Sequence, residues 1–144
     1  MMRVDFYILP GDSDRERALF ACRLAEKAYQ QGHRMFLRVA DAAEASRLDE
    51  LLWTFRQGSF LPHARMEAAD GEPILIGTEA GEQTPRDVLV NLAQTLPAHW
   101  SEHERVAEVV NQSPEVLQGS RARFRAYREH GSEPHTHRMD QRGA

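Results

Sequence analysis

The sequence predicts a three-layer α/β/α domain built around a mostly parallel sheet of about five strands. Two observations favour this class. Short apolar segments alternate with longer amphipathic ones, and several of the short segments are continuously apolar, as strands covered on both faces are. We expect short connections between these elements and right-handed crossovers between parallel strands. From the length of 144 residues we predict one domain over residues 1–131, followed by a flexible tail over 132–144.

The first strand is predicted at Val4–Leu9, because this segment is rich in β-formers and a Pro-Gly turn follows it. Ser13 and Glu16 stand three residues apart, which is the spacing of a capping box, and they predict the start of a helix that ends at Gly32. This helix carries apolar residues at helical spacing: Phe20, Leu24 and Ala28.

A second strand is predicted at Arg34–Val39, and Asp41 with Glu44 predicts the cap of a second helix. One apolar stripe runs along that helix: Ala45, Leu48, Leu52 and Phe55. Trp53 lies on the flank of the stripe. We therefore expect its side chain to face something other than the sheet.

Three further strands are predicted at Pro73–Gly77, Asp87–Leu92 and Arg105–Val110. The last of these has a helical alternative over Glu102–Val110. A final helix is predicted to begin at the Ser113-Pro114 pair, with the serine as N-cap and the proline in the first turn. It runs to about residue 130 and ends at a glycine. The residues that follow show no apolar periodicity, so we expect them to be mobile.

Composition excludes several classes of protein. The chain is 41% hydrophobic and 28% charged, which is typical of a globular domain, and its net charge of -4 argues against direct binding to nucleic-acid phosphates. The single cysteine, Cys22, cannot form an intrachain disulfide and predicts no oxidising compartment. No segment is long enough to cross a bilayer or typical of a cleaved signal peptide. We expect a cytoplasmic protein without a membrane partner.

The predicted topology is Rossmann-like, yet the sequence lacks a nucleotide-binding loop. The turn after the first strand contains a single glycine, so neither GxGxxG nor GxxxxGK[ST] is present, and Asp12 repels a phosphate there. Cys22 falls among core positions of a helix and is expected to be inert. We predict no cofactor and no enzymatic activity, and the alternative is a small α/β nucleotide-binding enzyme or sensor.

The histidines do not predict a catalytic or metal site. His130, His135 and His137 lie close together in the sequence, but without cysteine or a fixed fourth ligand they indicate only weak adventitious metal binding. No serine or carboxylate is spaced to form a catalytic triad with His63 or His99.

An unusually apolar loop follows the second predicted helix. The segment Leu51–His63 places Phe60, Leu61 and Pro62 where polar turn residues are normally found. Either this loop folds back on the core as an aromatic hinge, or it offers Trp53, Phe60 and Leu61 to another protein as an apolar patch.

The last predicted helix combines positive charge with an aromatic ring. Arg121, Phe124, Arg125 and Arg128 share one face by their spacing. Such a face can hold a carboxylate bidentately while the ring contacts an apolar group, which suits an acidic peptide with an aromatic end. The alternatives are a solvated basic face that covers Phe124, and a phosphate site, which needs more positive charge than this acidic chain supplies.

Several segments together resemble a known family, the chi subunit of bacterial DNA polymerase III. The resemblance covers nearly the whole chain to Gly131, in order, through DFYIL, ACRLAEKAYQQGHRMFLRV, LDELLWTFRQGSFLPH, PILIG, DVLVNL and SRARFRAYREHG. It implies a non-enzymatic accessory subunit of the clamp-loader complex. In that family chi joins the psi subunit and separately binds the acidic C-terminal tail of single-stranded DNA-binding protein, which ends in a phenylalanine carboxylate.

The resemblance also implies partners for the two surfaces. Four residues resemble the psi-facing patch: Trp53, Phe60, Leu61 and Pro62. Another four resemble the tail-binding site: Val110, Arg121, Phe124 and Arg125. We add Arg128 to this predicted site. In this comparison Arg121 meets the terminal carboxylate. The family often has tyrosine and lysine at positions 124 and 125, and psi is hard to recognise in many bacteria, so the patch serves psi, a psi-like protein or another replication or repair factor.

Overall fold

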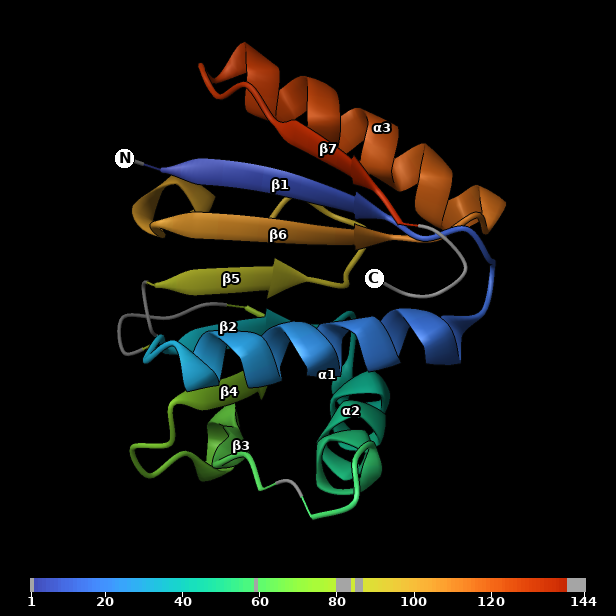
Figure 1. Cartoon of the computed structure of the whole chain (residues 1–144). Coiled ribbons are helices and arrows are strands. Elements are labelled where there is room, and N and C mark those ends of the chain that lie inside the picture. Colours follow the sequence, from blue (N-terminus) through green and yellow to red (C-terminus); the bar gives the residue numbers. More distant parts are fainter. Residues whose placement is uncertain (1, 59, 80–83, 85–86, 140–144) are drawn as a thin grey trace.

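The computed structural model describes residues 2–58, 60–79, 84 and 87–139. Within them the chain forms one seven-stranded sheet with the strand order β3-β4-β2-β5-β6-β1-β7, and every strand pair is parallel. The strand arrows in Figure 1 accordingly point the same way. The predicted class is confirmed, with two more strands than expected.

The five predicted strands are all present, and both additional strands lie at the edges of the sheet. The strands are β1 (Arg3–Ile8), β2 (Met35–Arg38), β3 (His63–Arg65), β4 (Ile74–Gly77), β5 (Val88–Asn91), β6 (Arg105–Val110) and β7 (His135–Arg138). The helices are α1 (Asp14–Gln30), α2 (Ala42–Thr54) and α3 (Pro114–Glu129), with short 3-10 turns η1 (Met66–Ala68) and η2 (Trp100–Glu102). The helical alternative for the β6 segment is therefore wrong.

Two of the helix starts are capped by side chains as the sequence predicted. Ser13 Oγ accepts a hydrogen bond from the backbone N–H of Glu16 at 3.2 Å. The Asp41 carboxylate accepts one from the N–H of Glu44 at 2.9 Å, and the Glu44 carboxylate accepts one from the N–H of Ala40 at 3.3 Å. Each cap contributes about 1 kcal/mol to helix stability. α3 starts differently, because its N-cap residue makes no side-chain cap bond and a proline follows it.

The helices divide between the two faces of the sheet and create two apolar cores. α1 and α2 cover one face, where Phe20, Leu48 and Leu52 pack on the sheet. α3 covers the other face, where Tyr127 packs with Phe6 and other side chains from the strands. The three layers predicted from the sequence are therefore confirmed.

The prediction of a flexible tail is wrong for the segment that forms β7. His135–Arg138 pairs in parallel with β1, and the N–H of Met139 continues this pairing by donating to the Ile8 carbonyl at 2.9 Å. Polar contacts hold the strand, since His137 lies 2.8 Å from the buried Asp5 carboxylate and stacks on Tyr7 at 5.0 Å. Residues 140–144 of the predicted tail lie outside the described part of the chain.

A chain of buried polar groups crosses the sheet under α3. The Glu108 carboxylate accepts hydrogen bonds from Arg123 Nε at 3.0 Å, Tyr127 Oη at 2.6 Å and Asn91 Nδ2 at 3.0 Å. Asn91 Oδ1 in turn accepts one from Arg38 Nη1 at 3.0 Å. All five side chains are buried. Burial and the neighbouring Glu108 raise the pKa of the Tyr127 hydroxyl, which therefore remains a hydrogen-bond donor.

Candidate protein-binding surfaces

The loop between α2 and β3 exposes two aromatic rings. Trp53 is 52% exposed and Phe60 is 64% exposed, and their ring centroids lie 5.6 Å apart. Pro62 is half-buried. We call Trp53 and Phe60 the aromatic patch. Large rings that stay in contact with each other while exposed to water are typical of protein-binding anchors.

The same loop also folds back on the core, as the first reading expected, while two of its rings stay exposed. Leu61 is only 3% exposed and packs in the core beneath α1 and α2, so it does not belong to the exposed surface. His63 supports the patch from below, because its ring lies 4.6 Å from Trp53. Its two ring nitrogens contact the carbonyl oxygens of Leu61 at 2.6 Å and Asp49 at 3.2 Å. These contacts position His63, and the His63 ring in turn supports the Trp53 ring.

The predicted cationic face of α3 is present. Arg121, Arg125 and Arg128 are exposed, and Phe124 between them is half-buried with its ring packed on Phe6 at 5.2 Å. We call these four α3 residues the arginine face. Arg123 points into the sheet instead, where its Nε donates to the buried Glu108 carboxylate.

Two arginines of this face are available to a ligand. Arg128 lies 3.6 Å from the exposed Glu133 carboxylate. Within the described residues, neither Arg121 nor Arg125 takes part in an ion pair. Their guanidinium donors therefore face solvent, where a carboxylate can accept two parallel hydrogen bonds.

Val110 does not line the arginine face as an open wall. It is fully buried in the core against which Phe124 packs. Two other half-buried apolar residues pack against the same core, Leu117 and Ile8. Ile8 pairs in register with Arg138, and paired residues of adjacent strands point to the same side of a sheet, so Arg138 adds positive charge on the α3 side.

Sequence reasoning missed Ile8 and Arg138 for different reasons. Val4, Phe6 and Ile8 alternate along β1, and this spacing, which is visible in the sequence, could have placed Ile8 on the same face as the other two residues. Arg138 offered no such signal, because its strand lacks apolar residues that would reveal it.

The structure provides partners for His63 and His99, which the sequence analysis considered as catalytic candidates. His99 Nδ1 lies 2.6 Å from the Glu102 carboxylate on the surface, and His63 is committed to backbone oxygens. Among the described residues, no group of three or more His, Cys, Asp or Glu side chains is arranged to hold a metal ion. In the same residues, no helix is both long and apolar enough to span a membrane.

Cys22 is fully buried in the core, and burial raises the pKa of its thiol to about 12. Because the thiolate is the reactive form, we expect the native protein to resist a thiol reagent such as Ellman's reagent at pH 8. The protein in urea is expected to react with one equivalent within minutes. Fast reaction of the native chain contradicts this burial.

Comparisons with known proteins identify the family to which the chain belongs. The family model described as DNA polymerase III chi subunit, HolC, matches residues 1–135. The chain belongs to the DNA polymerase III chi family. It is 41% identical over 139 residues to the DNA polymerase III subunit chi of Pseudomonas aeruginosa, covering 96% of this chain and 98% of that protein. It is 29% identical over 135 residues to the subunit chi of Escherichia coli K12, covering 89% and 92%.

Membership in the chi family makes the chain a component of DNA replication. Its fold is shared more widely: the crystal structure of T4 UvsW matches with a TM-score of 0.65 at 10% identity, over 96% of this chain and 42% of that one. At so low an identity the likeness concerns the fold alone. The function of the chi-family chain therefore has to be argued from its surfaces.

Proposed function

We propose that this chi-family protein is a non-catalytic adaptor that links the clamp-loader complex to single-stranded DNA-binding protein in the cytoplasmic replisome. One observation carries the proposal. The loop that carries Phe60 leads into β3 at one edge of the sheet, whereas α3, which carries the arginine face, lies beside β1 and β7 near the other edge (Figure 1). Two partners can therefore bind at the same time without overlapping.

The aromatic patch suits the more apolar partner. Trp53 and Phe60 offer two neighbouring exposed rings, and burying such rings supplies much of the free energy of a stable interface. The proposed partner is psi or an equivalent clamp-loader protein. A psi-like protein or another replication or repair factor with an apolar segment meets the same chemical requirements.

The arginine face suits an acidic peptide that ends in phenylalanine. Arg121 can take the terminal carboxylate in a bidentate contact, while Phe124 and Leu117 contact the phenyl ring. Arg125, Arg128 and Arg138 attract the acidic residues that precede the terminus. Direct binding to nucleic acid is not part of the proposal.

A bridging experiment tests the adaptor function. Immobilised clamp-loader partner is expected to retain single-stranded DNA-binding protein only when the chi-family chain is added. Arg121→Ala is expected to abolish this retention while the chain itself stays bound, because the two surfaces are separate. Retention that survives Arg121→Ala, or that needs no added chain, contradicts the proposal.

A further inference from the structure

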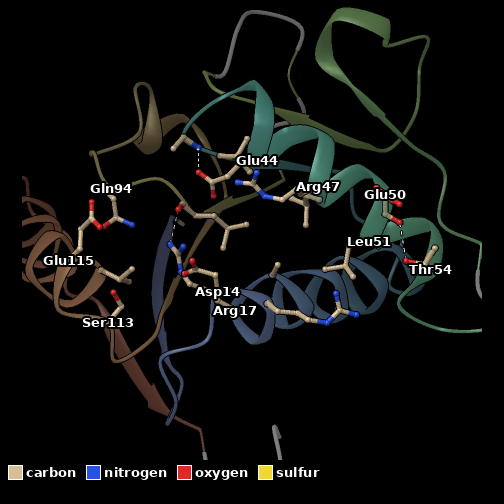
Figure 2. A pocket seen from close by; sticks show the side chains of 17 residues that line it. Asp14, Arg17, Glu44, Arg47, Glu50, Leu51, Thr54, Gln94, Ser113 and Glu115 are labelled. Carbon is tan, nitrogen blue, oxygen red and sulfur yellow. Dashed lines mark hydrogen bonds between the residues drawn. The ribbon is translucent and has the colours of Figure 1, made fainter.

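A cavity of about 760 Å³ opens at the carboxyl ends of the strands, between α1, α2 and the start of α3 (Figure 2). Its floor consists of buried apolar side chains: Val39, Leu48, Leu92 and Val116. Here β2 continues into α2 on one face of the sheet, whereas β5 continues towards η2 on the other. Open parallel sheets bind small molecules where the connections that follow two adjacent strands pass to opposite faces of the sheet. The cavity includes no residue of the aromatic patch or the arginine face.

One buried cation lines this cavity. Arg17 is 6% exposed, and its guanidinium donates to the carbonyl oxygens of Val109 at 2.8 Å through Nε and Leu92 at 2.7 Å through Nη2. Burial lowers the pKa of Arg17, and in the described part of the chain no carboxylate forms an ion pair with it. A buried charge is normally paired, so this one retains capacity for an anion.

Two donors at this end of the cavity remain unused. Neither Arg17 Nη1 nor Ser113 Oγ makes a hydrogen bond within the described residues, and both side chains line the cavity. Figure 2 shows them near the start of α1, at the same end of the cavity. A carboxylate placed there can accept from Nη1 while the rest of the molecule lies over the apolar floor.

The rim of the cavity restricts the charge of the ligand. Asp14, Glu44, Glu50 and Glu115 line it together with Arg15 and Arg47. A phosphate dianion or a nucleotide triphosphate is repelled by these carboxylates, whereas a single negative charge is balanced by Arg17. We infer that this cavity binds a small molecule with an apolar body and one carboxylate, held by Arg17.

The test is an NMR titration of the full-length chain with benzoate, followed through the Arg17 Nε–H signal. We expect a saturable shift with benzoate and none with benzamide, which has the same shape without the charge. Glu44→Gln removes a rim charge but keeps an acceptor for the Ala40 N–H, and it is expected to tighten benzoate binding about fivefold. Arg17→Gln is expected to abolish binding if the variant folds.

Benzoate also resembles the proposed ligand of the arginine face, so that face needs its own control. Arg121→Ala is expected to leave the shift of the Arg17 signal unchanged. An unchanged Arg17 signal, an equal response to benzamide, or no tightening by Glu44→Gln overturns the inference. None of these outcomes bears on the adaptor proposal, because the cavity and the two surfaces are separate.

Discussion

Replacing Glu108 with alanine is expected to destabilise the protein by about 3–5 kcal/mol, since it leaves the buried Arg123 guanidinium without its carboxylate. The substitution also removes the acceptor for the buried Tyr127 hydroxyl and for the Asn91 amide. Each buried polar group left without a partner costs about 1–3 kcal/mol, although such costs do not simply add. The measurement is urea unfolding followed by far-ultraviolet circular dichroism.

The control for this substitution is Glu104→Ala, since Glu104 is exposed and immediately precedes the same strand, β6. We expect it to change the free energy of unfolding by less than about 0.5 kcal/mol. Replacing Glu108 and Arg123 together by leucine and methionine is expected to recover part of the stability, because neither member of this ion pair is then left buried without the other, whereas Tyr127 and Asn91 still lack their acceptor. A loss below about 1 kcal/mol for Glu108→Ala contradicts a stabilising role of the network.

Phe60→Ala is expected to weaken binding of the clamp-loader partner by about 2 kcal/mol or more, roughly 30-fold, as removal of an interface anchor does. The ring is 64% exposed, so its loss leaves the fold and its stability nearly unchanged. Calorimetric titration of the partner into native and variant chains measures the effect.

Tyr29 offers a matched control for Phe60. Among the described residues, three large apolar side chains are exposed: Trp53 and Phe60 of the aromatic patch, and Tyr29. Tyr29 is 38% exposed and lies on α1, outside the patch. Tyr29→Ala is expected to bind the partner as tightly as the native chain. Equal losses for both variants indicate a general effect of removing exposed rings and contradict the assignment of the patch.

The interior strands of the fold were predictable because they are largely apolar segments buried on both faces. The two edge strands were not. His63–Arg65 and His135–Arg138 contain mainly polar residues, and their place in the sheet depends on pairing with β4 and β1 rather than on their own side chains. Periodicity cannot reveal a strand whose stability comes from its neighbour.

The surfaces were partly predictable for a similar reason. Helical spacing was sufficient to bring Arg121, Phe124 and Arg125 to one face, because residues three and four apart on a helix are neighbours. It could not show that Leu61 and Val110 are enclosed by other elements, since burial depends on how distant segments pack. Nor could it show that the two surfaces lie towards opposite edges of the sheet, which follows from strand order alone.

The central claim is that the arginine face binds the C-terminal end of an acidic peptide. The most direct measurement is fluorescence anisotropy with a labelled peptide that copies the C-terminal tail of single-stranded DNA-binding protein. We expect a dissociation constant near micromolar, about 8 kcal/mol of binding free energy, which rises with added salt. Arg121→Ala and a peptide with a C-terminal carboxamide are each expected to weaken binding about tenfold or more, because each removes one side of the same ion pair. Arg23→Ala, an exposed arginine of α1, is expected to change nothing. Absent binding, or equal affinity for the carboxylate and carboxamide peptides, contradicts the account.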